Sequence, residues 1–170
     1  MPVRMYNFTE GVRASLAAAR EQADRFGVPY VGTEHVLLGV LRSGASEAAR
    51  VLRTVDLDPA LLRQDIESRL GPNHTTPTAA DMPYTSAAKR VLERAMDEAR
   101  DLRDEAVGEE HLLLGLAGVE GGITGDVLRA RRVRLEELRA AVAASRSVRQ
   151  TRRRPWWQRF LGRPSAPPEA

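Results

Sequence analysis

The sequence contains no cysteine, a single lysine and few aromatic residues, which make up 5% of the chain. Without cysteine, the chain can form no disulfide, thiolate metal site, iron–sulfur cluster or cysteine nucleophile. The longest apolar run, residues 112–119, is far shorter than the roughly 18 residues that a membrane-spanning helix needs. The N-terminus lacks the apolar core of a signal peptide, so we expect a cytoplasmic protein.

The composition is that of an ordinary globular protein, but the charge is unevenly distributed. Apolar residues account for 42% and charged residues for 29% of the 170 residues, which suits one compact domain. Residues 146–170 contain seven arginines and one acid and so carry +6, and the net charge of +3 leaves −3 for residues 1–145. A mildly acidic body with a basic tail does not favour nucleic acid as a partner of the folded part.

A tandem repeat dominates the sequence. Residues 32–39, GTEHVLLG, recur as residues 108–115, GEEHLLLG, at an offset of 76 positions. The same offset aligns residues 8–66 with residues 84–142 without a gap. A constant register over this length indicates the duplication of one structural unit.

Each copy is predicted to form four helices. Apolar residues three and four positions apart define the first helix of copy one, and the same positions are apolar in copy two. We expect Thr9 and Thr85 to cap the first helix of each copy, and Thr33 to cap a helix that begins at residue 34.

The third and fourth helices have start signals of their own. Ser46 in copy one and Thr124 in copy two are the expected caps of the third helices, and Asp58 followed by Pro59 should begin the fourth helix of copy one. No segment alternates with a period of two, so we expect no sheet.

These elements predict an all-α fold, an eight-helix pseudo-twofold bundle made of two tandem four-helix repeats. Repeat one spans about residues 8–70, a linker rich in Pro and Thr covers residues 71–83, and repeat two spans about residues 84–145. A basic, flexible tail that contains Trp and Pro follows, at residues 146–170.

The duplicated Gly-x-Glu-His-x-Leu-Leu-Gly element, preceded in each copy by an aromatic-Thr pair and an Ala-rich helix, resembles the Clp N-terminal domain, and most closely its ClpC-type branch. The resemblance covers about residues 5–145. It implies a bacterial double-repeat domain that docks adaptors and substrates for AAA+ unfoldases. No Gly-x-x-x-x-Gly-Lys-[Ser/Thr] P-loop occurs in the sequence, so we expect a stand-alone, non-enzymatic binding module without a cofactor.

The resemblance also implies a ligand. In ClpC-type domains, the glutamates that match Glu34 and Glu110 receive the guanidinium of phosphoarginine, a degradation mark, and Thr9, Thr33 and Thr85 match positions near the helix starts that hold the phosphate. A carboxylate pairs well with a guanidinium, and free amides at a helix start suit a phosphate. The alternative interpretation is that each glutamate only opposes the helix dipole.

Three positions depart from the family pattern. Related domains usually carry arginine where Gly11 and Ala87 stand, and threonine where Glu109 stands. The lost cations and the added negative charge predict weakened phosphoarginine recognition, most of all in copy two.

The two repeated histidines are not expected to bind metal. His35 and His111 each follow a glutamate, but adjacent residues on a helix point about 100° apart. No His-x-x-x-His pair is present. The resemblance instead implies that both histidines form hydrogen bonds within their repeats.

A second surface is expected where the first helix of each copy begins, because the pseudo-twofold axis would bring these two starts together. In similar domains this face receives adaptor proteins and cyclic peptide antibiotics. The alternative is that its aromatic residues merely hold the helices in place. The residues concerned are Tyr6, Phe8, Arg13, Tyr84, Lys89 and Glu93.

The tail interleaves arginines with Trp156, Trp157 and Phe160. This pattern is compatible with an anionic membrane interface, with a docking peptide for a partner protein, or with an arginine-rich arm on nucleic acid. A tail without a binding role is the remaining alternative.

The leading functional hypothesis is a module that binds substrates, adaptors or peptides and acts as an accessory or decoy receptor in Clp-dependent proteolysis. Its expected partners are Clp unfoldase and protease components, adaptors, marked substrates and cyclic peptides. The alternative is a scaffold with a degenerate Clp-like domain, which the tail attaches to a membrane or a partner protein.

Overall fold

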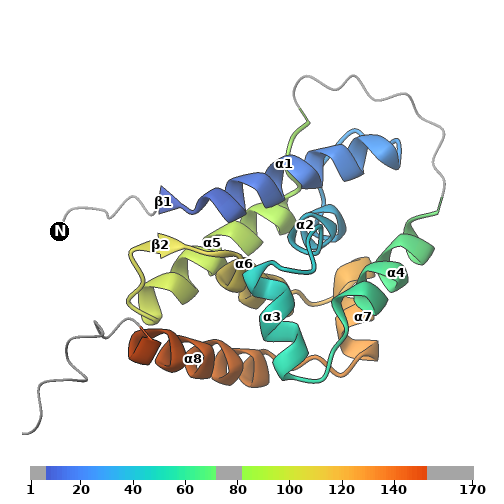
Figure 1. Ribbon diagram of the computed structural model, residues 1–170. Coiled ribbons are helices and arrows are strands. Elements are labelled where there is room, and N and C mark those ends of the chain that lie inside the picture. Colours follow the sequence, from blue (N-terminus) through green and yellow to red (C-terminus); the bar gives the residue numbers. More distant parts are fainter. Residues whose placement is uncertain (1–6, 72–81, 153–170) are drawn as a thin grey trace, which may run out of the picture.

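The computed structural model describes residues 7–71 and 82–152, the last six of them as backbone only. Within these ranges the chain forms eight helices and two short strands (Figure 1). Their order is β1 (Asn7–Phe8), α1 (Glu10–Arg25), α2 (Thr33–Val40), α3 (Glu47–Thr54), α4 (Pro59–Leu70), α5 (Ser86–Asp101), β2 (Ala106–Val107), α6 (Glu109–Ala117), α7 (Gly122–Ala130) and α8 (Leu135–Arg152). The predicted all-α fold of two four-helix repeats is confirmed.

Four predicted helix starts are confirmed by side-chain caps. In each, a side-chain oxygen accepts a backbone N–H of the first turn, which has no partner inside the helix. The capping residues and their distances are Thr9 (3.3 Å), Ser46 (3.1 Å), Asp58 (2.9 Å) and Thr85 (3.1 Å).

Two other predicted caps are wrong, because glycine occupies the cap position. Gly32 is the N-cap of α2, which makes Thr33 its first residue. Gly121 is the N-cap of α7 at φ 86°, a conformation that favours glycine, and Thr124 therefore lies inside the helix. At α2 the side chain that satisfies the cap is His35, whose Nδ1 accepts the N–H of Gly32 at 3.0 Å.

The structure also contains a small parallel sheet that the sequence did not predict. β1 pairs with β2, with Phe8 opposite Val107, and an isolated bridge joins Val31 to Tyr84. The two pairs are equivalent, because the offset of 76 converts Phe8 into Tyr84 and Val31 into Val107. Strands of two residues are too short to leave a period-two pattern, so the expectation of no sheet is wrong.

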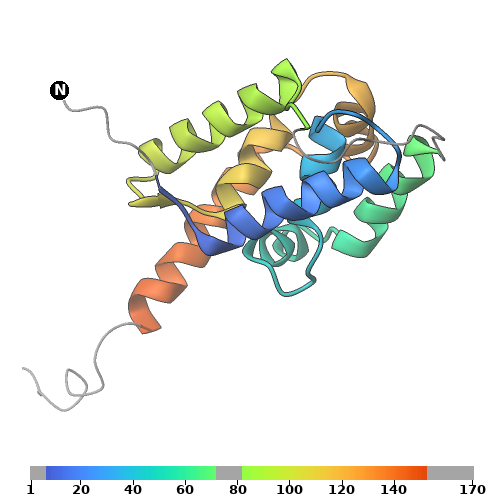
Figure 2. The same cartoon turned by 90° about the horizontal axis from the view of Figure 1, so that it is seen from above.

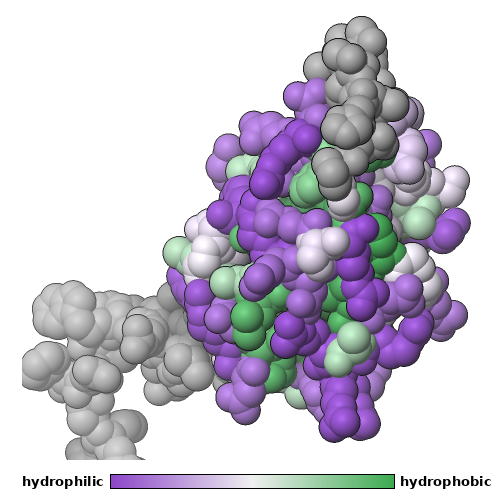
Figure 3. All heavy atoms as spheres, turned by 90° about the vertical axis from the view of Figure 1, so that its right-hand side faces the viewer, coloured by the Kyte–Doolittle hydropathy of each residue, from purple (hydrophilic) through white to green (hydrophobic). Residues whose placement is uncertain are grey.

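The two repeats interleave rather than lie side by side (Figure 2). α1 packs on α2 and α5 packs on α6, while α2 contacts α6 at the centre, α3 contacts α6 and α8, and α4 contacts α7. Fully buried leucines of α2 and α6, among them Leu37, Leu38, Leu113 and Leu114, form the middle of the core. The face drawn in Figure 3 is mostly polar, with apolar areas broken up between charged side chains.

The last helix extends the folded part beyond its predicted end. α8 continues to Arg152, whereas the sequence predicts a tail that begins at residue 146. Arg146 donates to the carbonyl oxygen of Leu102 at 2.9 Å and pairs with Asp104 at 2.5 Å, so it belongs to the packed domain. No helix in the described ranges combines the length and the apolar character that a membrane span requires.

Candidate functional site

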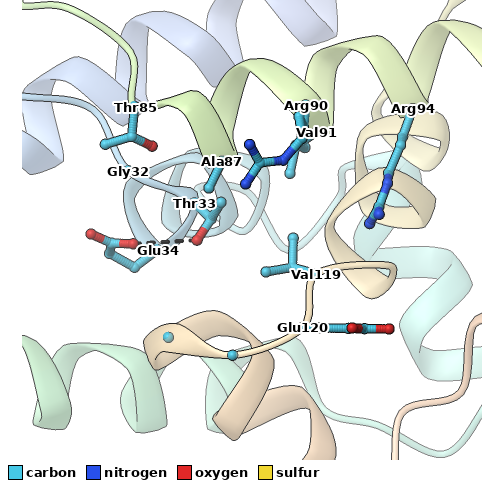
Figure 4. A pocket seen from close by; sticks show the side chains of 12 residues that line it. Gly32, Thr33, Glu34, Thr85, Ala87, Arg90, Val91, Arg94, Val119 and Glu120 are labelled. Atoms are coloured by element: carbon cyan, nitrogen blue, oxygen red, sulfur yellow. Dashed lines mark hydrogen bonds between the residues drawn. The ribbon is translucent and has the colours of Figure 1, made fainter.

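A cavity of about 550 Å³ opens at the N-terminus of α2, and we call it the α2 pocket (Figure 4). The start of α2 forms one wall, α5 forms the second, and the segment between α6 and α7 forms the third. Its lining residues are Gly32, Thr33, Glu34, Thr85, Ala87, Arg90, Val91, Arg94, Val119, Glu120, Gly121 and Gly122. Of the predicted ligand residues, the pocket therefore brings together Glu34, Thr33 and Thr85.

The α2 pocket carries charges of both signs. The side chain of Arg90 extends over Ala87 toward Thr33 (Figure 4). Arg90 is exposed and forms no ion pair with any residue that the structure describes. Arg94 donates to the carbonyl oxygen of Gly118 at the opposite wall. Glu34 and Glu120 supply carboxylates, so the lining can meet an anionic and a cationic group of one ligand.

Glu34 is folded back over the start of its own helix. A Cβ atom placed on Gly32 would lie only 2.3 Å from Glu34 Oε1, and Thr33 Oγ1 donates to Glu34 Oε2 at 3.4 Å. In this position the carboxylate opposes the dipole of α2 and forms part of the pocket wall at the same time. The geometry accommodates both interpretations of this residue.

Glu110 occupies the equivalent position at α6 and folds back over Gly108 in the same way. Burial raises the pKa of Glu110, and the carboxylates of Asp104 and Glu109 act in the same direction. Val28 and Thr33 stand at the corresponding positions of copy one, so the start of α6 holds two acidic groups that the start of α2 lacks.

Glu109 is the largest difference between the two copies. It stands where copy one has Thr33, its side chain is only 10% exposed, and its Oε1 accepts from Arg42 at 2.7 Å. Ser15 Oγ donates to the same oxygen at 3.0 Å, and the backbone N–H of Glu47 donates to Oε2 at 3.2 Å. Both oxygens of this carboxylate therefore accept hydrogen bonds from within the protein.

The structure also places three potential metal ligands together. Asp104, Glu110 and His111 each have a ligand atom within 4.8 Å of the others. His111 Nδ1, however, accepts the N–H of Gly108 at 2.8 Å, so the neutral ring carries its proton on Nε2. That nitrogen lies 3.0 Å from Asp104 Oδ2 and has no lone pair for a metal. The cluster suits the structural role that the resemblance implies for this histidine.

The predicted adaptor face is not assembled as expected. α1 and α5 run in roughly opposite directions, so their starts do not lie side by side (Figures 1 and 2). The pseudo-twofold axis places the start of each helix beside the other repeat's strand-like segment, as Phe8 beside Val107 shows. The ring of Tyr84 instead lies 5.3 Å from the guanidinium carbon of Arg20, in the second half of α1. Arg13, Lys89 and Glu93 are exposed on their separate helices.

Four predicted interaction residues fall outside the described part of the chain. They are Tyr6 at the N-terminus and Trp156, Trp157 and Phe160 in the tail.

Sequence reasoning missed the arginines of the site. Arg90 and Arg94 lie one and two turns after Ala87, which places all three on one face of α5. This spacing was a usable signal, whereas the contact between Arg42 and Glu109 joins residues 67 positions apart and left none.

Comparison with known proteins places this geometry in a family. The model of the Clp repeat (R) N-terminal domain matches residues 7–148. The ClpC/MecB protein of Bacillus subtilis, a negative regulator of genetic competence, is 39% identical over 135 residues, which are 79% of this chain and 16% of that protein. The chain therefore spans about a sixth of the length of this relative.

Solved structures share the fold at lower identity. The N-terminal domain of ClpD from Arabidopsis thaliana superposes with a TM-score of 0.64 at 21% identity, over 86% of this chain and 99% of that domain. A ClpV N-domain solved in complex with a VipB peptide gives a TM-score of 0.64 at 16% identity, over 84% of this chain and 92% of that one. With its duplicated helical repeat and the family model matching nearly its whole folded part, the chain belongs to the Clp repeat N-terminal domain family.

Proposed function

We propose that this chain is a non-catalytic receptor that binds peptides or partner proteins in the α2 pocket. The observation that carries the proposal is the pairing, in one cavity, of an arginine without an ion-pair partner among the described residues, Arg90, with a carboxylate at a helix start, Glu34. A ligand with both an anionic and a cationic group would be held at two points, which orients it.

The relatives support a role in recognition. The ClpV N-domain, which has the same fold, was solved with a VipB peptide. Clp-type relatives such as ClpC extend far beyond the segment that this chain matches. We infer that the chain serves as an accessory or decoy receptor in Clp-dependent proteolysis, where it holds substrates or adaptors that the N-domain of an unfoldase would also bind.

Phosphoarginine in marked substrates is the ligand that we propose to test first. Its guanidinium would pair with Glu34, and its phosphate would lie near Arg90 and the free amides at the start of α2. Arg90 would supply from the next turn of α5 the cation that Ala87 lacks. The carboxylate of Glu120 adds repulsion to a phosphate, so we expect affinity below that of a site with arginine at position 87.

Isothermal titration calorimetry with a phosphoarginine peptide tests this proposal. The full chain should bind the phosphorylated peptide and not the same peptide with unmodified arginine, and Glu34→Ala should weaken binding. If neither the wild type nor the variant gives a binding signal, phosphoarginine is not the ligand. A screen of adaptor-derived peptides would then decide whether the α2 pocket is a receptor site at all.

The proposed place in proteolysis has its own test. A Clp unfoldase–protease that degrades a marked substrate should slow when the full chain is added in excess, because the two receptors would compete for the mark. Faster degradation would instead identify the chain as a delivery factor. An unchanged rate, together with failure to co-purify Clp subunits from the native cell, would contradict both roles.

A further inference from the structure

The two copies of the repeat each form a site at a helix start, but only the site at α2 is open. The walls of the α2 pocket have counterparts around the start of α6: Ala87 corresponds to Gly11, Val91 to Ser15, and Gly122 at the start of α7 to Ser46, the N-cap of α3. We call this counterpart the α6 site.

The carboxylate of Glu109 occupies the α6 site. It contacts Ser15, the counterpart of Val91 in the α2 pocket lining, and the N–H of Glu47 in the first turn of α3. A Cβ atom on Gly11 would lie 3.0 Å from Glu109 Cδ, so the absence of a side chain at position 11 makes room for the carboxylate. Three donors of different kinds, a guanidinium, a hydroxyl and a helix N-terminal amide, converge on its two oxygens.

Each site also has a guanidinium close by, but the two arginines come from different positions of the repeat. Arg42 reaches the α6 site and donates to the carbonyl oxygen of Gly39 at 3.3 Å. The counterpart of Arg42 is Gly118, and there the guanidinium comes from Arg94 of α5, which would lie 2.8 Å from a Cβ on Gly118. At the α6 site the carboxylate of Glu109 neutralises the guanidinium of Arg42. The α2 pocket has Thr33 at the position of Glu109 and therefore no carboxylate there.

We propose that the α6 site is an anion-binding site permanently filled by Glu109, so that the chain receives an anionic ligand group at the α2 pocket only, one per chain. Glu109 acts as a built-in ligand that closes one of the two duplicated sites. The statement about ligand number rests on the proposed function, whereas the anion-binding character of the α6 site does not.

Chemical rescue tests the anion-binding character directly. The variant Glu109→Ala removes the carboxylate and leaves its donors in place, so its melting temperature should fall below that of the wild type. Sodium acetate or inorganic phosphate should raise it again, compared with sodium chloride at equal ionic strength. The double variant Glu109→Ala/Arg42→Ala, which lacks the guanidinium, should gain nothing beyond the chloride control. Rescue by acetate alone would identify a site the size of a carboxylate, and rescue by phosphate a larger one. If these anions raise the melting temperature of Glu109→Ala no more than that of the wild type, the proposal is overturned.

A second measurement applies if Glu109→Ala does not fold. Glu109→Gln keeps the length of the side chain and removes its charge, so it should lower the melting temperature below that of the wild type. Adding Arg42→Ala to Glu109→Gln should cost less than Arg42→Ala costs in the wild type, because the guanidinium has already lost its charged partner. Equal costs of Arg42→Ala in both backgrounds would overturn the proposal.

The ligand number is measured separately. If the phosphoarginine peptide binds the wild type once, Glu109→Thr should bind it twice, because threonine restores the residue found at α2. Absence of binding to either protein would contradict the proposed function and leave the rescue result unaffected. One site in both proteins would refute the role of Glu109 as the closing residue.

Discussion

Asp104 Oδ2 lies 3.0 Å from Nε2 of His111, and this contact has no counterpart in the other repeat. The equivalent histidine, His35, is held by the same bond from its N-cap glycine to Nδ1, but Val28 stands where Asp104 would be. His35 Nε2 is therefore buried without a hydrogen-bond partner among the described residues. Both copies keep the histidine that holds the helix start, but the residue beside its Nε2 differs between them.

The two histidines predict a loss of stability in mild acid. Burial lowers the pKa of both His35 and His111 in the folded protein. The unfolded chain then binds protons more readily, so their contribution is fully present above about pH 6.5 and declines as the pH falls, by at most about 1.4 kcal/mol per pH unit for each histidine. Urea unfolding between about pH 7.5 and 5 should show the decline. His35→Gln, which keeps an acceptor for the cap, should flatten it, and identical slopes for both proteins would contradict this assignment.

Arg139 should be needed to hold α8 on α5. Its Nε and one terminal nitrogen donate to Glu98 at 3.1 and 2.6 Å, and the Glu98 side chain is only 11% exposed. Arg139→Ala leaves this carboxylate poorly solvated and should cost about 1–3 kcal/mol of unfolding free energy. Arg139→Lys should recover part of this free energy, because lysine keeps the positive charge but cannot donate to both carboxylate oxygens as the planar guanidinium does. Arg129→Ala, which removes an exposed pair with Asp126, serves as the control and should change stability by less than about 0.5 kcal/mol.

The close approach of α1 to α2 should not tolerate a methyl group. A Cβ atom on Gly39 would lie 2.1 Å from the carbonyl oxygen of Ser15 and 2.9 Å from the amide nitrogen of Ala19. Gly39→Ala must push the two helices apart, at a cost of about 1–3 kcal/mol or more. Thermal unfolding measures it, with Gly44→Ala as the control, since the Cβ there meets only the end of the Arg53 side chain. A neutral Gly39→Ala would mean that the helices are not in contact at this residue.

Arg90 should set the affinity of the α2 pocket for anionic peptides. Arg90→Ala removes a guanidinium without an ion-pair partner among the described residues and should weaken binding of a phosphoarginine peptide about tenfold, which corresponds to roughly 1.4 kcal/mol. Arg100→Ala, on the same helix but outside the pocket lining, should bind like the wild type. Equal loss in both variants would point to non-specific attraction, which higher salt would abolish.

Most of the fold could be predicted from the sequence because it depends on local chemistry. The duplication, the apolar stripes and the caps at Thr9, Ser46, Asp58 and Thr85 reflect interactions within a few residues, which a single chain displays directly. The same applies to Glu34 and Thr33, which helix geometry alone places at one helix start.

The charge network and the closed site depended on contacts between distant segments. Glu109 looked like a repulsive charge in the sequence, yet Arg42 and Ser15, which are 67 and 94 positions away, neutralise it and convert it into an internal ligand. No periodicity encodes such a pairing, because it arises only when the repeats interleave and bring α1 and the end of α2 to the start of α6. Local patterns were enough to predict two similar helical repeats with a candidate site in each. Which site is open and which is filled followed from the packing of the repeats against each other.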